Sequence, residues 1–106
     1  MDFEGRVDVS VICMVMHEMP SRAHAEMLHS MMAATPEGDV WVVDIDPVYR
    51  PSLMMLSGEP YVPDYLKSIE DTFVDVAKSA GRELSTFAIV PGHVRVWIFE
   101  HTPRRS

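Results

Sequence analysis

The pattern of hydrophobic and polar residues predicts a series of short strands and helices. The first strand is expected over Val7–Met16, a run rich in Val and Ile without Gly or Pro, which is typical of a strand buried on both faces. His17 and Glu18 follow this run directly, and Pro20 stops it. A second apolar, β-branched run over Asp39–Ile45 predicts another strand.

Two segments have the three-to-four-residue spacing of amphipathic helices. Ser21 is placed to cap the first helix, which extends to residue 34. Its predicted apolar stripe consists of Met27, Leu28, Met31 and Ala34. The second helix opens at Pro63-Asp64 and closes at Gly81. Its apolar positions are Tyr65, Leu66, Ile69, Phe73, Val76, Ala77 and Ala80.

The order of these segments predicts the fold class. The first helix lies between two strands, as in a right-handed βαβ unit with parallel strands. Two more strand patterns, over 84–90 and 93–99, are separated by Pro91-Gly92 and predict an antiparallel hairpin. We therefore expect an α/β protein with the order β-α-β-α-β-β, a parallel strand pair and a C-terminal antiparallel hairpin. No linker interrupts the pattern, so residues 1–106 are predicted to form a single domain.

Composition narrows the classes of function. The net charge of −7 disfavours nucleic-acid binding, because that affinity depends on clustered Lys and Arg. No apolar run is long enough to span a bilayer, and Met1–Glu4 is acidic rather than basic as in a secretory signal. The single cysteine, Cys13, fits a reducing compartment and is predicted to be a small buried hydrophobic residue. We therefore predict a cytoplasmic protein with neither a membrane nor a nucleic-acid partner.

Several segments together resemble the C-terminal half of a class I S-adenosylmethionine-dependent methyltransferase domain. Residues 3–20 resemble the family's fourth strand and the residues after it, and residues 21–34 the following helix. Residues 39–46 resemble its fifth strand, and residues 92–99 its last strand, which that family inserts antiparallel into the sheet. The resemblance implies a partial Rossmann-like sheet, S-adenosylmethionine as cofactor and a small-molecule methyl acceptor.

One feature of that family is missing from this chain. The family holds its cofactor with a glycine-rich loop, which lets the backbone approach the ligand closely. This sequence contains no Gly-x-Gly, and its glycines stand apart at positions 5, 38, 58, 81 and 92. We therefore expect a partial domain in which the glycine-rich, cofactor-binding half is absent, and no cofactor-binding residues can be assigned.

His17 and Glu18 are the candidate catalytic residues. In open α/β sheets ligands bind beyond the carboxyl ends of the strands, which is where these two side chains project. His17 can act there as a general base or as a hydrogen-bonding partner of the substrate. The alternative is that both residues only end the strand and that Glu18 interacts with the dipole of the following helix.

The long loop after the second predicted strand supplies the candidate substrate-binding residues. This loop, residues 46–61, mixes aromatic residues, methionines, Arg50 and Glu59, as a small-molecule pocket does. The alternative is a surface loop whose apolar residues pack over the edge of the sheet. Asp44 and Asp46 alternate onto one side of their strand; we expect one to cap the loop and the other to face the crevice. The predicted substrate-binding residues are Asp46, Tyr49, Arg50, Met54, Met55 and Tyr61.

No metal site is predicted from the sequence. His17, His24 and His29, with Glu18 and Glu26, do not have the spacing that places metal ligands on one helical face. His24 and His29 are instead expected on a solvated helix face.

Two hypotheses from different classes follow. In the first, the chain transfers a methyl group to a small molecule once it is completed by the missing N-terminal half. In the second, it is a non-catalytic interaction module or homodimer that assembles through the exposed strand Val7–Met16, because an edge strand without its neighbour recruits a partner strand. A coincidental likeness to another small α/β fold is the third possibility.

Overall fold

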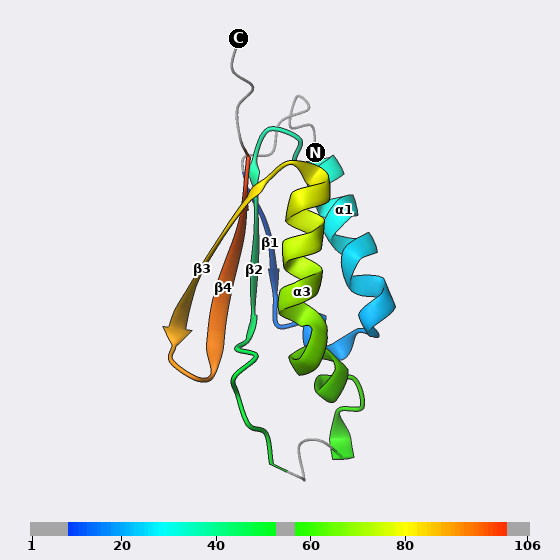
Figure 1. The fold of residues 1–106 in the computed structure, drawn as a ribbon, viewed down its shortest axis with the longest axis vertical. Helices are drawn as coiled ribbons and strands as arrows, with labels where there is room; N and C mark the ends of the chain where they lie inside the picture. The colour runs from blue at the N-terminus through cyan, green and yellow to red at the C-terminus, as the bar shows by residue number, and fades with distance from the viewer. Residues whose placement is uncertain (1–8, 53–56, 102–106) are drawn as a thin grey trace, which may run out of the picture.

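The computed structural model describes residues 9–52 and 57–101, which form a four-stranded sheet covered by helices (Figure 1). The strands stand in the order β1-β2-β4-β3. Their bounds are Val9–Cys13 for β1, Asp39–Ile45 for β2, Glu83–Val90 for β3 and Val94–Glu100 for β4. Helix α1 spans His24–Ala34, helix α3 spans Val62–Ala80, and the short 3-10 turns η1 and η2 span Met16–Glu18 and Ser21–Ala23. The predicted α/β class and element order are confirmed.

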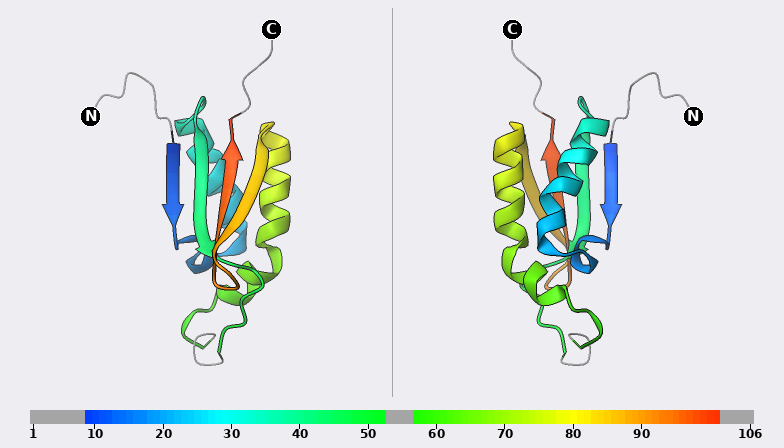
Figure 2. Two further views of the ribbon diagram at one scale, coloured as in Figure 1. Left: turned by 90° about the vertical axis from the view of Figure 1, so that its left-hand side faces the viewer. Right: turned by 90° about the vertical axis from the view of Figure 1, so that its right-hand side faces the viewer.

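Both long helices lie on the same face of the sheet (Figure 2). Strands β1 and β2 are parallel, whereas β4 runs antiparallel to both β2 and β3. Strand β3 is therefore parallel to β2, and the connections through α1 and α3 step across the sheet in the same direction. Two right-handed crossovers in the same direction place their helices on the same face. The hairpin then inserts β4 between β2 and β3.

The hydrophobic core lies between the sheet and the two helices. Val42 of β2 and Trp97 of β4 are paired in register and are at most 2% exposed. Phe73 of α3 contacts Trp97 and Phe99, with ring centroids 4.9 and 5.4 Å apart in edge-to-face arrangements. Leu28 of α1 completes the layer and is fully buried. Most of the described apolar burial is therefore on one face of the sheet.

The opposite face of the sheet is covered by no described element (Figure 2). Large apolar side chains are exposed there. Val9 and Val11 of β1 are 45% and 59% exposed, and Phe87 and Ile89 of β3 are 48% and 53% exposed. Alternation along each strand directs these side chains away from the helices. We call the surface formed by these four residues the open face.

The first strand differs from its prediction in length and in burial. It was expected over Val7–Met16, whereas the described strand ends at Cys13, because Met14 has a positive φ of 57° that turns the chain into η1. Among the described strands it lies at the sheet edge, as the second hypothesis expected, but the prediction that both of its faces are buried was wrong, because one face is exposed. Cys13 is consequently exposed, and its prediction as a buried residue was wrong.

The first helix also differs in its start and in its buried face. Ser21 makes no capping hydrogen bond; the chain passes through η2, and α1 begins at His24. The buried residues of α1 are His24, Leu28 and Met32, so only Leu28 of the predicted stripe is among them. His24 is 0% exposed, which contradicts its expected place on a solvated face, whereas His29 is exposed as expected.

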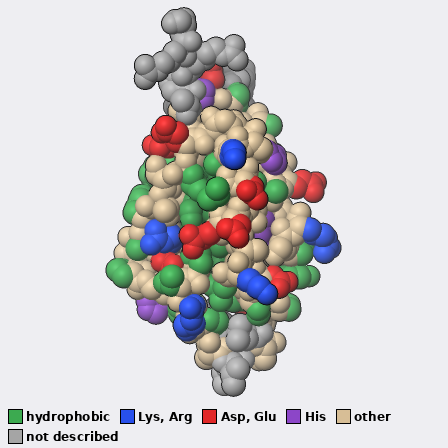
Figure 3. Space-filling view, in the orientation of Figure 1, with side chains coloured by type: hydrophobic (Ala, Val, Ile, Leu, Met, Phe, Trp, Pro, Cys, Tyr) green, Lys and Arg blue, Asp and Glu red, His purple; other side chains and the backbone are tan. Residues whose placement is uncertain are grey.

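Helix α3 and the hairpin follow their predictions closely. Gly81 ends α3 with a φ of 68°, a left-handed conformation that glycine adopts without a steric penalty. Gly92 has a φ of 77° in the turn between β3 and β4. Neither α1 nor α3 combines the length and the apolar character that crossing a bilayer requires. In Figure 3, the Lys and Arg side chains of the visible face stand apart rather than forming a continuous basic patch.

Candidate functional site

A buried contact between His17 and Asp44 lies at the carboxyl ends of the two parallel strands. Asp44 is the penultimate residue of β2, lies on the strand face that packs against the helices and is 0% exposed. Its Oδ2 accepts a hydrogen bond of 2.8 Å from the Met16 backbone N–H, and its Oδ1 accepts one of 2.8 Å from Ile45 N–H. The same Oδ1 lies 2.7 Å from Nδ1 of His17, which donates to it. Asp44 thus fixes the position of η1 and the orientation of the imidazole.

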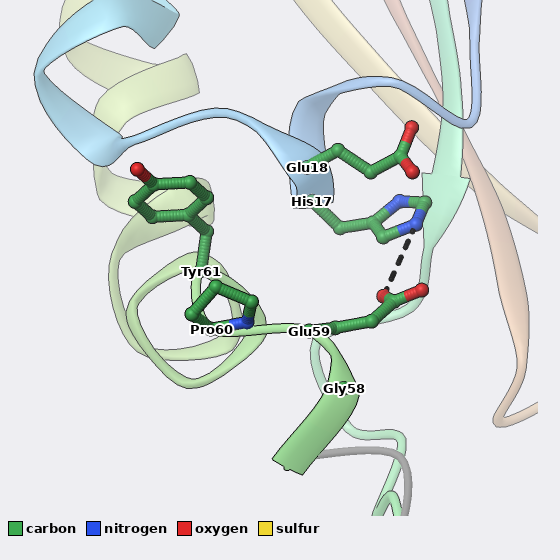
Figure 4. A pocket seen from close by; sticks show the side chains of 6 residues that line it. All are labelled: His17, Glu18, Gly58, Glu59, Pro60 and Tyr61. Atoms are coloured by element: carbon green, nitrogen blue, oxygen red, sulfur yellow. Dashed lines mark ion pairs between the residues drawn. The ribbon is translucent and has the colours of Figure 1, made fainter.

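The exposed side of His17 forms one wall of a pocket (Figure 4). Its Nε2 lies 3.6 Å from Oε2 of Glu59, which comes from the far end of the loop after β2. In Figure 4 the Glu18 and Glu59 carboxylates lie on either side of the His17 ring, while the Tyr61 ring lies apart from them. The lining residues are His17, Glu18, Gly58, Glu59, Pro60 and Tyr61.

Tyr65 of α3 forms the inner support of this site. Its phenol donates a hydrogen bond to the Ile45 carbonyl, and its ring meets the rings of His17 and His24 edge-on, at centroid distances of 6.3 and 6.2 Å. Burial raises the pKa of the Tyr65 phenol above its usual range, and the neighbouring carboxylates Asp44, Asp46 and Glu70 raise it further. The phenol is therefore a hydrogen-bond donor in the folded protein and not a base.

This raised pKa predicts a loss of stability at alkaline pH. Above about pH 10 an unfolded tyrosine releases its proton, whereas folded Tyr65 retains it. The stabilisation that Tyr65 contributes to the free energy of unfolding is thus fully present below that pH. It is lost as the pH rises further, by about 1.4 kcal/mol per pH unit. In urea unfolding at a series of pH values above about 10, we expect the free energy of unfolding of Tyr65→Phe to fall less steeply with pH than that of wild type. Tyr61→Phe, at an exposed position, is the control and should keep the wild-type slope. An unchanged slope in Tyr65→Phe would contradict the assignment.

The second acidic residue, Asp46, lies outside the pocket. Its Oδ1 accepts a hydrogen bond of 3.0 Å from Val48 N–H, and its Oδ2 pairs with Nε of Arg95 at 3.2 Å. The carboxylate is 2% exposed. Asp46 therefore caps the loop, as one of the two acids was expected to do. Asp44 is buried against His17 instead of facing the crevice, and the engaged carboxylate of Asp46 does not face the pocket as a substrate-binding residue.

The other predicted substrate-binding residues are dispersed. Tyr61 lines the pocket, and Tyr49 instead packs its ring against His93 at a centroid distance of 5.4 Å. Arg50 is exposed and donates to the backbone carbonyls of Val48 and Tyr49. Met54 and Met55 lie outside the described residues.

Sequence reasoning missed the roles of three residues in the site, Glu59, Tyr65 and His24. Glu59 was noted only as one charged residue of the loop, although its place between Gly58 and Pro60 marks a turn that can present a side chain. Tyr65 was assigned to the apolar stripe of a helix, and its spacing gave no sign that its hydroxyl reaches β2. His24 is a third case: its Nε2 donates to the Met16 carbonyl at 2.6 Å and supports η1 from behind.

The pocket brings together three side chains that can each offer a ligand atom to a cation. The potential ligand atoms of His17, Glu18 and Glu59 all lie within 4.8 Å of one another. They come from η1 and from the segment before α3, which the folded chain brings to one place. The pocket can therefore hold a polar or cationic group between an imidazole and two carboxylates.

Comparison with known proteins identifies no relative. No protein-family model, no curated protein and no solved structure matches this chain. The functional assignment therefore rests on the residues and the geometry described above.

Proposed function

We propose that this chain is the substrate-side half of a Rossmann-like, S-adenosylmethionine-dependent methyltransferase domain that acts on a small molecule. The observation that carries the proposal is the sheet order β1-β2-β4-β3, with antiparallel β4 inserted between two strands that are parallel to each other. This is the arrangement that the resemblance predicts for the end of such a sheet. The pocket beyond the carboxyl ends of β1 and β2 lies where ligands of open α/β sheets bind.

The open face and the edge of β1 support the idea of a missing half. Val11 and Ile89 are more than half exposed on a sheet face that other α/β sheets cover with helices. Exposed apolar surface of this kind marks a surface that a further element covers. In the proposal, a segment carrying the remaining strands continues the sheet beyond β1 and covers the open face with its helices.

The chain does not by itself fit the cofactor. No Gly-x-Gly is present, and Gly58, the glycine beside the pocket, is not part of a glycine-rich turn after a strand. The proposal therefore assigns cofactor binding to the missing half. The His17 ring, which Asp44 holds through Nδ1–H, would lie beside the substrate, and Tyr61 would form an apolar wall.

A calorimetric titration with S-adenosylmethionine tests the proposal on two proteins. One is the 106-residue chain, and the other is the reading frame extended upstream of Met1 through a strand and a glycine-rich loop. We expect no binding by the shorter protein and micromolar binding by the longer one. Binding by the shorter chain would contradict the half-domain assignment. A reading frame without such a loop, or an extended protein that does not bind, would contradict the methyltransferase assignment.

A second candidate function is a homodimer or interaction module that uses β1. The described sheet ends at β1, whose outer edge pairs with no described strand, and its apolar side chains Val9 and Val11 are exposed. An uncovered, apolar edge strand pairs with a second copy or another chain.

The substitution Val11→Lys tests this candidate. We expect wild-type protein to sediment as a dimer and Val11→Lys to sediment as a monomer, because a charge on the edge strand opposes strand pairing. Val48→Lys is the matched control, since Val48 is 60% exposed in the loop after β2 and is not part of the edge strand. A monomeric wild-type protein at high concentration would contradict dimerisation through β1.

A further inference from the structure

We propose that His17, Glu18 and Glu59 bind a divalent transition-metal ion, for which Mn²⁺ serves as the probe. The ligand atoms of these three residues all lie within 4.8 Å of one another, a separation that one ion can bridge. The site is independent of whether the chain belongs to a methyltransferase, because each ligand is contributed by the described chain.

The imidazole is oriented as in protein metal sites. A metal-bound histidine usually donates its other ring N–H to a carboxylate, which fixes the tautomer and makes the ligand nitrogen more basic. His17 meets this condition, since its Nδ1 donates to Asp44 Oδ1 at 2.7 Å in a buried environment. Asp44 is held in turn by two backbone N–H groups, from Met16 and Ile45. The lone pair of Nε2 is thereby directed toward the pocket.

The Glu59 carboxylate gives a second, independent indication. Its Oε2 has almost no accessible surface and accepts no hydrogen bond from any described residue. It lies 3.6 Å from Nε2 of His17, although that nitrogen carries a lone pair when Nδ1 holds the proton. Two electron-rich atoms at that distance repel each other unless a proton on Nε2 or a metal ion lies between them. A metal ion satisfies both atoms together, and Glu18 adds a further carboxylate oxygen.

The donor set indicates the class of ion. Imidazole nitrogen suits ions such as Zn²⁺ and Fe²⁺, and carboxylate oxygen suits Mn²⁺ and also binds Zn²⁺, so this mixed donor set fits the divalent first-row transition metals as a class. Three protein ligands leave coordination positions open, as in catalytic sites that bind water or substrate. Pro60 and Tyr61 line the same pocket. An oxygen-bearing small molecule is the chemical class that such an open site accepts.

Titration with Mn²⁺ followed by electron paramagnetic resonance tests the site, because the signal of the free ion falls as the ion binds. Glu59→Gln and Glu18→Gln each remove one charged ligand with little change in shape. We expect each to weaken Mn²⁺ binding by about tenfold or more. Glu26→Gln, at an exposed position on α1, is the matched control and should bind as wild type does. Mn²⁺ rather than a softer ion is used because exposed Cys13 is a poor ligand for it.

Three results would overturn the proposal. They are the absence of Mn²⁺ binding by the wild-type protein, equal binding by wild type and Glu59→Gln, and weakening by Glu26→Gln as large as that by Glu59→Gln. Circular dichroism of each variant establishes that it is folded, and Glu59 is suited to this because its side chain is 35% exposed and can be changed without opening the core. The readout needs no S-adenosylmethionine, so its outcome is separate from that of the proposed function.

Discussion

Replacing Asp44 with alanine is expected to lower the free energy of unfolding by about 3–5 kcal/mol. The substitution removes the acceptor of three buried hydrogen bonds, from Met16 N–H, Ile45 N–H and His17 Nδ1–H. Each of these donors then stays buried without a partner, which costs more than the hydrogen bond itself contributes. Urea unfolding followed by circular dichroism measures the loss.

The control for this prediction is Asp71→Ala, at an exposed position on α3. Surface substitutions of that kind change stability by less than about 0.5 kcal/mol. Asp44→Asn should fall between the two, because the amide retains one acceptor oxygen but has no negative charge to hold His17. A loss below about 1 kcal/mol in Asp44→Ala would mean that Asp44 does not organise the site in the way its contacts indicate.

Phe73→Ala is expected to have an effect of similar size, about 3–5 kcal/mol, through the core rather than through the site. Phe73 is fully buried and packs edge-to-face against both Trp97 and Phe99. Its removal leaves a cavity between α3 and β4 that the rigid aromatic neighbours do not close. Small domains have only about 5–15 kcal/mol of stability in total, so a large part of the population should unfold on mild heating.

Val74→Ala is the matched control for Phe73→Ala. Val74 is the next residue on α3 but is 56% exposed, so its truncation removes little buried surface. Phe73→Leu should lose less than Phe73→Ala, because it retains most of the apolar volume. Equal thermal midpoints for Phe73→Ala and Val74→Ala would contradict the placement of the core between α3 and β4.

Local pattern was sufficient to predict the elements. The bounds of β2 were predicted at Asp39–Ile45, and α3 was predicted to begin near Pro63 and to end at Gly81. These features depend on residues close together in the sequence: β-branched runs, helical spacing, and Gly or Pro at the ends. The same reasoning failed for Val7–Met16, because an apolar run does not reveal whether a neighbouring strand or helix exists to cover it. Cys13 was misplaced for that reason.

The sequence pattern also did not predict which face of the sheet the helices cover. Both crossovers place their helices on one side of the sheet, so Val9 and Phe87 remain exposed, although their residue types are typical of a buried strand. The sequence pattern records how apolar each strand is, whereas the direction of the connections decides which face the helices of this chain cover.

The candidate site depended most on tertiary structure. The sequence by itself determined that His17 and Glu18 follow the first strand and that Asp44 lies at the end of the second, and from this a polar site at the carboxyl edge of the sheet could be predicted. Only the folded chain decided that Asp44 binds His17 across 27 residues, that Glu59 reaches the same imidazole and that Asp46 turns away to Arg95. The physical reason is that periodicity constrains the side of an element on which a residue lies, whereas the partner it meets depends on the packing of elements distant in the chain.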